Sequence, residues 1–239
     1  MKYLANTIKG LERDHNEDRV IINGTVLSHG KINGKTNKTL VAAICDGVGG
    51  TSGGEVAAEM AASSFLDFCV SKTSPLYVTS YLNRVNRDIT EAQKSHPTYS
   101  DMATTIAGAV IVGEIFLLFN MGDARIYEVR KGVIIQKSRD HVVVCEDFFS
   151  GDKREAITSY LGGDGHACFP SVRRDIISKD TEGFFICSDG IHKFVSDAEL
   201  LQLLGGKKDM EEKRKAILQR ALQNGSKDDI SFIYVDITD

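Results

Sequence analysis

The sequence predicts one α+β domain over residues 1–239, in which antiparallel hairpins are flanked by two helical pairs. Two apolar runs of strand length each end in Asp-Gly, at Val41–Gly47 and at Gly183–Gly190, which is typical of buried strands that stop sharply. Helical spacing of apolar residues recurs on both sides of a strand-rich middle. No internal repeat, low-complexity tract or linker divides the chain, so a single domain is expected.

The N-terminal half is expected to start with a hairpin and to continue with two helices. Weak alternation of apolar and polar residues predicts the first strand, and a run of apolar residues predicts the second. Apolar residues at three- and four-residue spacing follow, and prolines bracket the second of these stretches. The expected elements are strands at Arg19–Val26 and Thr39–Cys45 joined by the polar, loose tip Ser28–Lys35, a helix from about Gly54 to Val70, and a helix between Pro75 and Pro97.

The second half returns to strands and closes with helices and a last strand. Tight turns at Gly113-Glu114 and Lys131-Gly132 separate the central strands, whereas residues 145–175 have no clear period and receive no assignment. A serine cap opens the first C-terminal helix. The expected strands are Thr105–Val112, Ile115–Asn120, Ile126–Arg130, Val133–Lys137, Phe184–Ser188 and Ile230–Val235, and the expected helices begin at Ser196 and span Asp209–Gln223.

The composition is that of an ordinary globular protein and excludes several classes of partner. A net charge of −4 with no block of Lys or Arg gives no reason to expect binding to nucleic acid or to a membrane. The first residues lack the apolar core of a signal peptide, and no apolar stretch approaches the length of a membrane span. The cysteines are scattered without a Cys-x-x-Cys pair, which favours a reducing compartment, so a cytoplasmic protein is expected. They are Cys45, Cys69, Cys145, Cys168 and Cys187.

Acidic residues stand at the edges of several predicted strands. Each aspartate alone reads as a turn residue or a helix cap. Five acidic clusters at strand ends instead predict one convergent acidic site, and hard cations such as Mg²⁺ and Mn²⁺ prefer such oxygen ligands. Zinc is disfavoured because no His or Cys set has ligand spacing. The clusters are Asn16-Glu17-Asp18, Asp46-Gly47, Asn120-Met121-Gly122-Asp123, Asp189-Gly190 and Asp228-Asp229.

A set of short motifs in fixed order spans nearly the whole chain. They are Arg13-x-x-Asn16-Glu17-Asp18, Asp46-Gly47-Val48-Gly49-Gly50 with Gly54-Glu55, Ala103-Thr104-Thr105, Asn120-Met121-Gly122-Asp123-Ala124-Arg125, Asp140-His141, Ser188-Asp189-Gly190 and Asp228-Asp229-Ile230-Ser231. In this order the chain resembles the metal-dependent protein serine/threonine phosphatases of type 2C, the PPM group, and especially their bacterial branch. The resemblance implies a four-layer α-β-β-α sandwich, with two antiparallel β-sheets flanked by helical pairs and a two-metal site at one end.

The resemblance also assigns roles to individual residues. It implies that two Mn²⁺ or Mg²⁺ ions are bridged by Asp46, that a third, weaker ion binds at Asp123, and that Arg13 holds the substrate phosphate. Catalysis is then expected to rest on Arg13, Asp46 and Asp189. The implied metal-site residues are Asp46, the Gly47 carbonyl, Asp189, Asp228 and Asp123, with Glu17 and Asp18 close by to orient metal-bound waters.

The implied reaction is hydrolysis of phosphoserine and phosphothreonine in proteins by in-line attack of a hydroxide that bridges the two metals. The planar fork of Arg13 suits a phosphate, although the ordinary alternative for this residue is a surface salt bridge with Glu12 or Asp14. The expected partners are phosphoproteins, including a serine/threonine protein kinase or its targets, and the expected oligomeric state is a monomer.

The chain departs from the family pattern at several positions. Val48 stands where many eukaryotic members have the histidine proposed as the proton donor, and valine cannot donate a proton. His15 is a substitute acid or a solvated loop residue, and His192 is a site residue or part of an exposed turn. His141 is expected to be a structural hydrogen-bond partner. Asp228-Asp229 replaces the more usual Asp-Asn, which leaves the ligating carboxylate open between the two, with Asp228 as the positional match.

The segment Cys145–His166 matches the flap beside the active site of the family. It contains Phe148-Phe149 and Gly162-Gly163-Asp164-Gly165, and it is either a substrate-contacting loop or an ordinary surface excursion. Two other functions stay open from the sequence. One is a pseudophosphatase that binds phosphoproteins without turnover, although Asp46, Asp189 and Asp228 are all retained. The other is a two-metal hydrolase of small phosphate esters.

Overall fold

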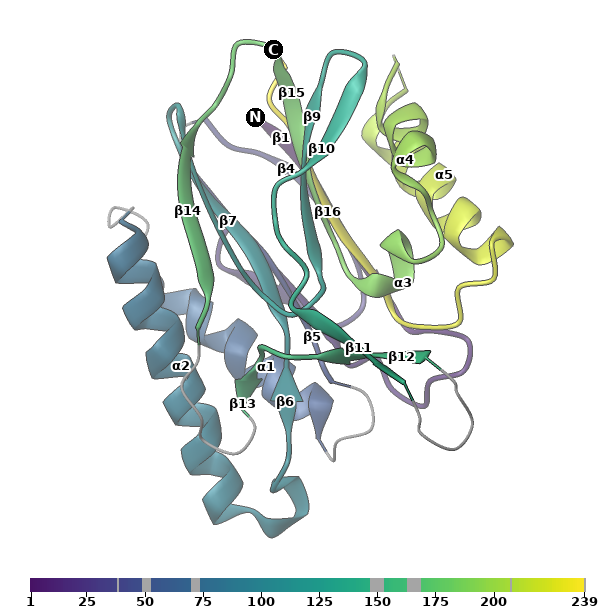
Figure 1. Cartoon of the computed structure of the whole chain (residues 1–239). Coiled ribbons are helices and arrows are strands. Elements are labelled where there is room, and N and C mark those ends of the chain that lie inside the picture. The colour runs from purple at the N-terminus through teal and green to yellow at the C-terminus, as the bar shows by residue number, and fades with distance from the viewer. Residues whose placement is uncertain are drawn as a thin grey trace.

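Two six-stranded antiparallel β-sheets lie face to face, with helices on both outer faces (Figure 1). This is the four-layer α-β-β-α sandwich that the resemblance implies. The computed structural model describes residues 1–37, 39–48, 53–69, 74–146, 153–162, 169–206 and 208–238. None of the helices within these ranges is long and apolar enough to cross a membrane.

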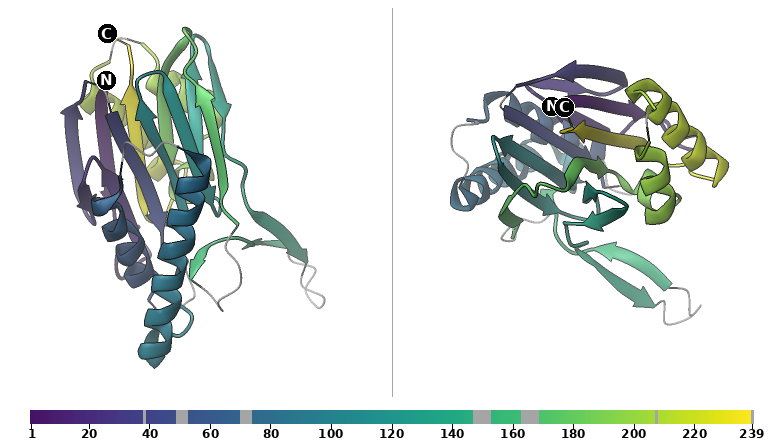
Figure 2. Two further views of the ribbon diagram at one scale, coloured as in Figure 1. Left: turned by 90° about the vertical axis from the view of Figure 1, so that its left-hand side faces the viewer. Right: turned by 90° about the horizontal axis from the view of Figure 1, so that it is seen from above.

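The first sheet contains the strands that carry the C-terminal acidic motifs. Its spatial order is β10 (Val133–Gln136), β9 (Arg125–Arg130), β15 (Thr181–Cys187), β16 (Ile230–Asp236), β1 (Lys2–Ile8) and β4 (Gly30–Lys35). The two chain termini meet at one end of this sheet (Figure 2), because β1 starts and β16 ends there, with Lys2 paired to Asp236. The opposite ends of these strands therefore face away from the termini.

The second sheet contains the strands that carry the N-terminal acidic motifs. Its spatial order is β14 (Ser171–Ile176), β8 (Ile115–Met121), β7 (Ile106–Val112), β5 (Thr39–Asp46), β2 (Asp18–Ile22) and β3 (Thr25–Leu27). Two smaller pairs complete the described strands, β6 (Ala103–Thr104) with β13 (Leu161–Gly162) and β11 (Val142–Glu146) with β12 (Lys153–Ile157). Figure 2 shows that the β11–β12 hairpin projects away from the sandwich.

Helices cover each sheet from outside. The second sheet is covered by α1 (Gly54–Ser64) and α2 (Pro75–Ser95), and the first by α3 (Asp189–His192), α4 (Asp197–Leu204) and α5 (Met210–Gln223). The caps explain where the longer helices begin. The Ser74 hydroxyl accepts from the Tyr77 amide ahead of Pro75, and Ser196 and Asp209 open full capping boxes.

Three apolar layers hold the four structural layers together. One lies between α1, α2 and the second sheet, one between the sheets, and one between the first sheet and the C-terminal helices. Phe116 and Phe184 stack across the middle layer with ring centroids 3.8 Å apart. Buried Cys45 and Cys187 belong to the outer layers as small apolar residues. The strand ends are thus fixed by rigid packing on both sides of each sheet.

The structure corrects several predicted elements near the N-terminus. The expected strand Arg19–Val26 is interrupted at Asn23 and Gly24, whose φ values of 46° and 75° form a tight turn between β2 and β3. The expected loose tip is wrong, because its residues Gly30–Lys35 form the edge strand β4. Exposure alternates along that strand, and polar residues tolerate an edge position.

Other corrections concern strands and helix ends. The N-terminal segment Lys2–Ile8, left unassigned by the sequence, is the inner strand β1. The first helix ends at Ser64 and continues only as a 3₁₀ turn over Phe65–Asp67, short of the expected end at Val70, which lies outside the described residues. The unassigned region 145–175 contributes β12, β13 and most of β14.

Candidate active site

The predicted acidic residues converge at the end of the sandwich opposite the termini. They come from different strands of both sheets, and each stands where its strand begins or ends. Asp18 begins β2, Asp46 ends β5, Asp123 follows β8, Asp189 follows β15 and opens α3, and Asp228 precedes β16. We call this group of five aspartates the acidic end. Its members lie close enough that the charges of Asp18, Asp189, Asp123 and Asp228 all raise the pKa of Asp46, in addition to the larger effect of burial.

Asp18 and Asp46 form the centre of the acidic end. The β2–β5 ladder places them directly opposite each other. Asp18 is fully buried, and neither of its carboxylate oxygens has a hydrogen-bond partner among the described residues. Burial, followed by the charges of neighbouring aspartates, raises the pKa of Asp18. The Asp18 carboxylate is therefore buried opposite Asp46 without the donors that normally accompany such a group.

Two serine hydroxyls lie near Asp18 and favour its ionised form, although both donate elsewhere. The Ser231 hydroxyl bonds to Thr7 Oγ1 at 2.8 Å. The Ser188 hydroxyl bonds at 3.4 Å and 3.5 Å to the carbonyls of Asp229 and Ser231. Since a hydroxyl has one proton to donate, these serines leave the Asp18 carboxylate free to accept from a cation-bound water.

The backbone of Asp46 and Gly47 is held by the segment Ala103-Thr104-Thr105, which explains why that motif belongs to the set. The Asp46 carbonyl accepts from the Thr105 amide at 2.8 Å and from Thr104 Oγ1 at 2.9 Å. Gly47 forms an isolated bridge with Thr104. A Cβ at Gly47 would lie 2.6 Å from the carbonyl carbon of Gly54, so only glycine allows α1 to start this close.

Asp228 and Asp229, which the sequence leaves open as alternative ligands, have different environments. Both oxygens of Asp229 accept backbone amides, from Gly10 at 2.7 Å and from Glu17 at 2.8 Å. Asp229 is 3% exposed and ties the loop before β2 to the start of β16. Asp228 Oδ1 instead accepts from the Arg13 side chain, at 2.7 Å from Nε, and from the neighbouring Asp229 amide at 2.8 Å. Asp229 therefore serves the loop, and Asp228 belongs to the acidic end.

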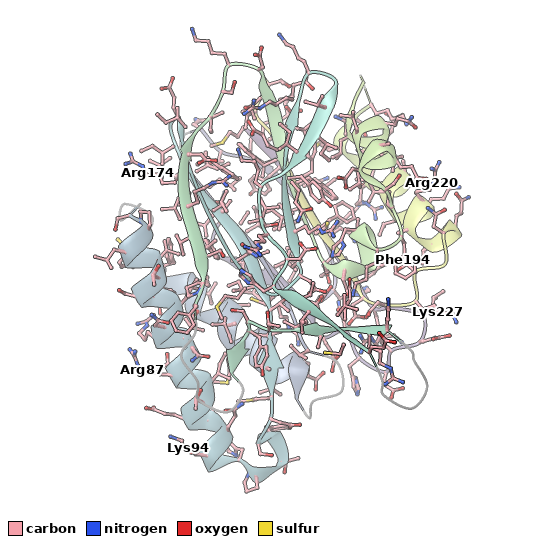
Figure 3. The ribbon with its side chains drawn as sticks, in the orientation of Figure 1. Arg87, Lys94, Arg174, Phe194, Arg220 and Lys227 are labelled. Carbon is pink, nitrogen blue, oxygen red and sulfur yellow. The ribbon has the colours of Figure 1, made fainter. Side chains whose placement is uncertain are left out.

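Arg13 pairs with site residues and not with the surface partners considered from the sequence. Its guanidinium contacts Asp228 at 2.7 Å and Glu17 Oε2 at 3.2 Å. Glu12 pairs with Lys227 instead, and Lys227 is labelled in Figure 3 on the loop that enters β16. Burial of the Arg13 guanidinium opposes its charge, but these carboxylates outweigh burial and raise its pKa.

A polar cavity of about 380 Å³ opens beside Arg13. Its lining includes His15, Glu17, Glu55 and Tyr99 besides Arg13 itself. Arg13 thus lines the cavity and also pairs with Asp228. Its guanidinium can offer positive charge to an anion bound in the cavity next to the acidic end.

Asp189 and Asp123 share one cation of the chain. Lys193 Nζ lies 2.8 Å from Asp189 Oδ2 and 3.4 Å from Asp123 Oδ2. Asp189 reaches this position because Gly190 packs against the Asp229 backbone, where a Cβ would come within 2.0 Å of the carbonyl oxygen. The glycine after Asp189 thus does more than shape a turn, since it brings α3 against the start of β16.

The histidines have distinct positions. His141 accepts from the Gly122 amide at 3.3 Å and contacts Ser171 Oγ at 2.9 Å, which confirms its structural role. His192 is half-buried and not part of an exposed turn, and burial lowers its pKa to about 3. His15 is exposed and lines the cavity. Val48 is described, whereas Gly49 and Gly50 of the same motif lie outside the described residues.

The expected flap is described only in part. β11 and β12 form its base, and Val143 and Val144 are 47% and 60% exposed on this hairpin. Phe148-Phe149 and Gly163-Asp164-Gly165 lie outside the described residues.

The donor set of the acidic end fits hard divalent ions. All the side-chain atoms that it offers to a metal are carboxylate oxygens. In the described structure, the observation that best fits a bound cation is that both buried oxygens of Asp18 lack a hydrogen-bond partner. As the side chains stand, no group of three or more His, Cys, Asp or Glu residues in the described ranges could hold a metal ion. Asp228 and Asp189 turn instead to Arg13 and Lys193, so metal binding requires these side chains to rearrange.

Comparison with solved structures places the fold among bacterial serine/threonine phosphatases. A bacterial serine phosphatase superposes with a TM-score of 0.84 at 24% identity, covering 99% of this chain and 97% of that one. Stp1 of Staphylococcus aureus gives 0.84 at 23% identity, with 99% and 95% covered. The catalytic domain of the phosphatase PstP, solved with two manganese ions, gives 0.74 at 23% identity, with both chains fully covered.

The family is established by sequence. The family model "Protein phosphatase 2C" matches residues 28–229, and the chain belongs to that family. Among relatives, the serine/threonine phosphatase stp of Listeria monocytogenes is 27% identical over 247 residues, covering 96% of this chain and 93% of the relative. PstP of Mycobacterium tuberculosis is 27% identical over 253 residues, covering all of this chain and 45% of the relative.

Sequence reasoning missed three contributors to the site. Lys193 was not considered, although its position four residues after Asp189 is the spacing of a helical ion pair. Asp229 was considered only as a ligand and not as the anchor of a loop. Asn16 has no role in the sequence-based prediction beyond its motif, yet its side chain accepts from the Asp18 amide at 3.0 Å and donates to Thr7 at 2.8 Å.

Proposed function

We propose that this chain, as a single catalytic domain over residues 1–239, is a metal-dependent phosphatase that hydrolyses phosphoserine and phosphothreonine in proteins. The observation that carries the proposal is the pair Asp18 and Asp46, two facing carboxylates at strand ends with no donor for Asp18 in the described structure. Family membership and the names of the relatives support the substrate class.

The proposed metal ligands are Asp46 with the Gly47 carbonyl, and Asp189 with Asp228. Glu17 and Asp18 are proposed to accept hydrogen bonds from metal-bound waters and so to orient them. When bound, two Mn²⁺ or Mg²⁺ ions would activate a water for in-line attack on phosphorus and offset charge on the phosphoryl oxygens. The packed strand ends fix the backbone of these residues before any ligand arrives, so that only side chains have to rearrange when the ions bind.

Arg13 is the proposed phosphate-binding residue. Its guanidinium lies between Asp228 and the cavity, so a phosphate entering from the cavity meets two N–H donors in a fixed plane. Asp228 accepts from Nε and Nη2 and Glu17 from Nη1, which keeps the guanidinium oriented and leaves one N–H on each Nη for a phosphate. As charge spreads over the phosphoryl oxygens in the transition state, this pairing strengthens.

The side chains near the cavity restrict the choice of proton donor within the protein. Val48 has no proton to donate, and His141 is bonded to Gly122 and Ser171. Of the histidines in the described ranges, His15 lines the cavity. We therefore propose that the leaving oxygen is protonated by His15 or by solvent in the cavity.

The proposed partners are phosphoproteins, among them a serine/threonine kinase or its targets, and the protein is proposed to act as a monomer.

The test compares an aryl phosphate with a phosphothreonine peptide, each in Mn²⁺ and in EDTA. The proposal expects turnover of both substrates in Mn²⁺ and loss of turnover in EDTA. Asp189→Asn should nearly abolish turnover while the far-UV spectrum is unchanged.

Three outcomes would contradict the proposal. Activity that survives EDTA would exclude the two-metal mechanism. Turnover of the aryl phosphate alone would indicate a hydrolase of small esters. Binding of the peptide without turnover of either substrate would indicate a pseudophosphatase.

A further inference from the structure

The ammonium group of Lys193 stands between two carboxylates of the acidic end. Its Nζ lies 2.8 Å from Asp189 Oδ2 and 3.4 Å from Asp123 Oδ2, so one cation already bridges the two aspartates. Asp123 is 5% exposed, and the described structure gives its carboxylate no other ion-pair partner. The side chain of Lys193 is 40% exposed, which lets it reach this pair from the solvent side.

Both sides of this bridge are fixed to the fold. Lys193 follows the last residue of α3, and its amide bonds to the Asp189 carbonyl at 3.1 Å. Phe194, labelled in Figure 3 beside α3, marks the place. On the other side, His192 bonds to the Asp123 backbone, and Arg125 pairs with Asp140 at 2.7 Å to hold the loop after Asp123. The backbone segments that carry Lys193 and Asp123 are therefore both held by contacts within the fold.

A divalent ion bound by Asp123 and Asp189 would occupy the same place as the Lys193 ammonium and would carry charge of the same sign. Such an ion lies about 2.0–2.6 Å from carboxylate oxygens, which places it against an ammonium at hydrogen-bond distance from the same oxygens. Two positive groups at that separation repel strongly at a partly buried site. The ammonium and the ion are therefore alternatives for one position.

We propose that the Lys193 ammonium takes the place of a third divalent ion at Asp123, so that this chain works with two metal ions and one built-in cation. The inference rests on the proposed function, because it assigns Lys193 beside the same metal centre. It replaces the third ion that the resemblance implies. Lys193 is then a positioning residue, which fixes Asp189 through Oδ2 and offsets the charge of Asp123.

The test counts bound Mn²⁺ by equilibrium dialysis together with the electron paramagnetic resonance signal of free Mn²⁺. We expect two ions per chain in the wild type and a gain of a further ion in Lys193→Gln, whose affinity for that ion rises at least about tenfold. Adding Asp123→Asn to Lys193→Gln should remove the gained ion. Lys193→Arg keeps the charge and should stay at two.

Lys31→Gln is the matched control. Lys31 is 45% exposed and pairs with Glu211 at 2.8 Å, much as Lys193 pairs with Asp189, but it lies away from the acidic end. This variant should bind two ions. Thermal unfolding of each variant verifies that the counted protein is folded.

The outcomes separate this inference from the proposed function. A wild type that binds three ions, or a folded Lys193→Gln that stays at two, overturns the inference and leaves the two-metal phosphatase standing. A wild type that binds no Mn²⁺ overturns the metal centre and the inference with it. If Lys193→Gln does not fold, the ion counts of the wild type and of Lys193→Arg decide.

Discussion

Glu128 and Asp18 are both buried carboxylates, yet they have opposite surroundings. Glu128 accepts from Arg130 Nε at 2.9 Å, from Lys137 Nζ at 3.1 Å and from the Thr181 hydroxyl. Burial alone would raise the pKa of Glu128, but these hydrogen bonds outweigh it and the pKa is lowered. Asp18 has no such donor in the described structure, and burial raises its pKa.

The difference separates stability from function. The Glu128 cluster, formed by Glu128, Arg130, Lys137, Asp175 and Thr181, satisfies its charges within the chain and stabilises the fold. The acidic end keeps carboxylates close together, and among the described residues Arg13 and Lys193 are the cations paired with them, which costs stability and leaves the Asp18 oxygens without a partner. We expect substitutions in the two regions to have opposite effects.

The largest effect is expected at the centre of the acidic end. Asp46→Asn should lower kcat for a phosphothreonine peptide in Mn²⁺ by at least about 10³-fold, because the amide is a weaker ligand than a carboxylate between two cations. The variant should stay folded. Steady-state kinetics measure the change, and Asp175→Asn, which alters the Glu128 cluster, is the control that should keep the wild-type kcat.

Glu128→Gln should lower stability and leave kcat unchanged, the reverse of what is expected for Asp46→Asn. It leaves the charges of Arg130 and Lys137 without their buried partner, which should lower the free energy of unfolding by about 1–3 kcal/mol. The kcat per folded molecule should not change, because Glu128 lies outside the acidic end. Urea unfolding measures the loss, and an unchanged midpoint would show that the Glu128 cluster is not a source of stability.

A smaller gain in stability is expected from Asp18→Asn in EDTA. Burial raises the pKa of Asp18 to about 8, so folding at pH 7.5 has to protonate or desolvate a carboxylate that is ionised in the unfolded chain. The amide removes this requirement, and the free energy of unfolding should rise by at least about 1 kcal/mol. The same urea experiment at pH 7.5 measures it. A loss of stability in EDTA would mean that the Asp18 carboxylate is satisfied in the folded protein.

The smallest expected effect is a difference in pH dependence. The folded-state pKa of Glu128 lies below its ordinary value of 4.5, so the unfolded chain binds more protons and stability rises with pH in that window. The contribution is present above about pH 4.5 and is lost as pH falls through the folded-state pKa. Urea unfolding measured between pH 3 and 6 should show that the free energy of unfolding rises less steeply with pH in Glu128→Gln than in the wild type. An equal pH dependence in both proteins would contradict a lowered pKa of Glu128.

The sequence predicted the parts of the fold that depend on local pattern. Apolar runs and helical spacing located β5, β8 and α2, because their burial is uniform or periodic. β1 was missed because its buried Asn6 and Thr7 read as polar until their partners are known. Arg214 bonds to Asn6 and Ser231 bonds to Thr7, and both partners lie more than 200 residues along the chain.

The predicted site residues were brought together, but their pairing was not foreseen. Strand ends with Asp-Gly predicted convergence, since each carboxylate stands at the tip of a rigid element. The distinction between Asp228 and Asp229 depends on the amides of Gly10 and Glu17, which reach Asp229 across more than 200 residues of sequence. The bridge of Lys193 to Asp123 depends on the short helix α3, which ends just before Lys193 and which local pattern did not predict.

The most direct test of the central claim is the free energy of unfolding with and without Mn²⁺. If the acidic end is a cation site whose unpaired carboxylates destabilise the fold, Mn²⁺ at about 100 times the Kd of each site should stabilise the wild type by about 2.7 kcal/mol per bound ion, or about 5.4 kcal/mol for two. Glu128→Gln should gain as much, and Asp46→Asn should gain far less. An equal gain in the wild type and Asp46→Asn, or no gain in the wild type, would contradict the account.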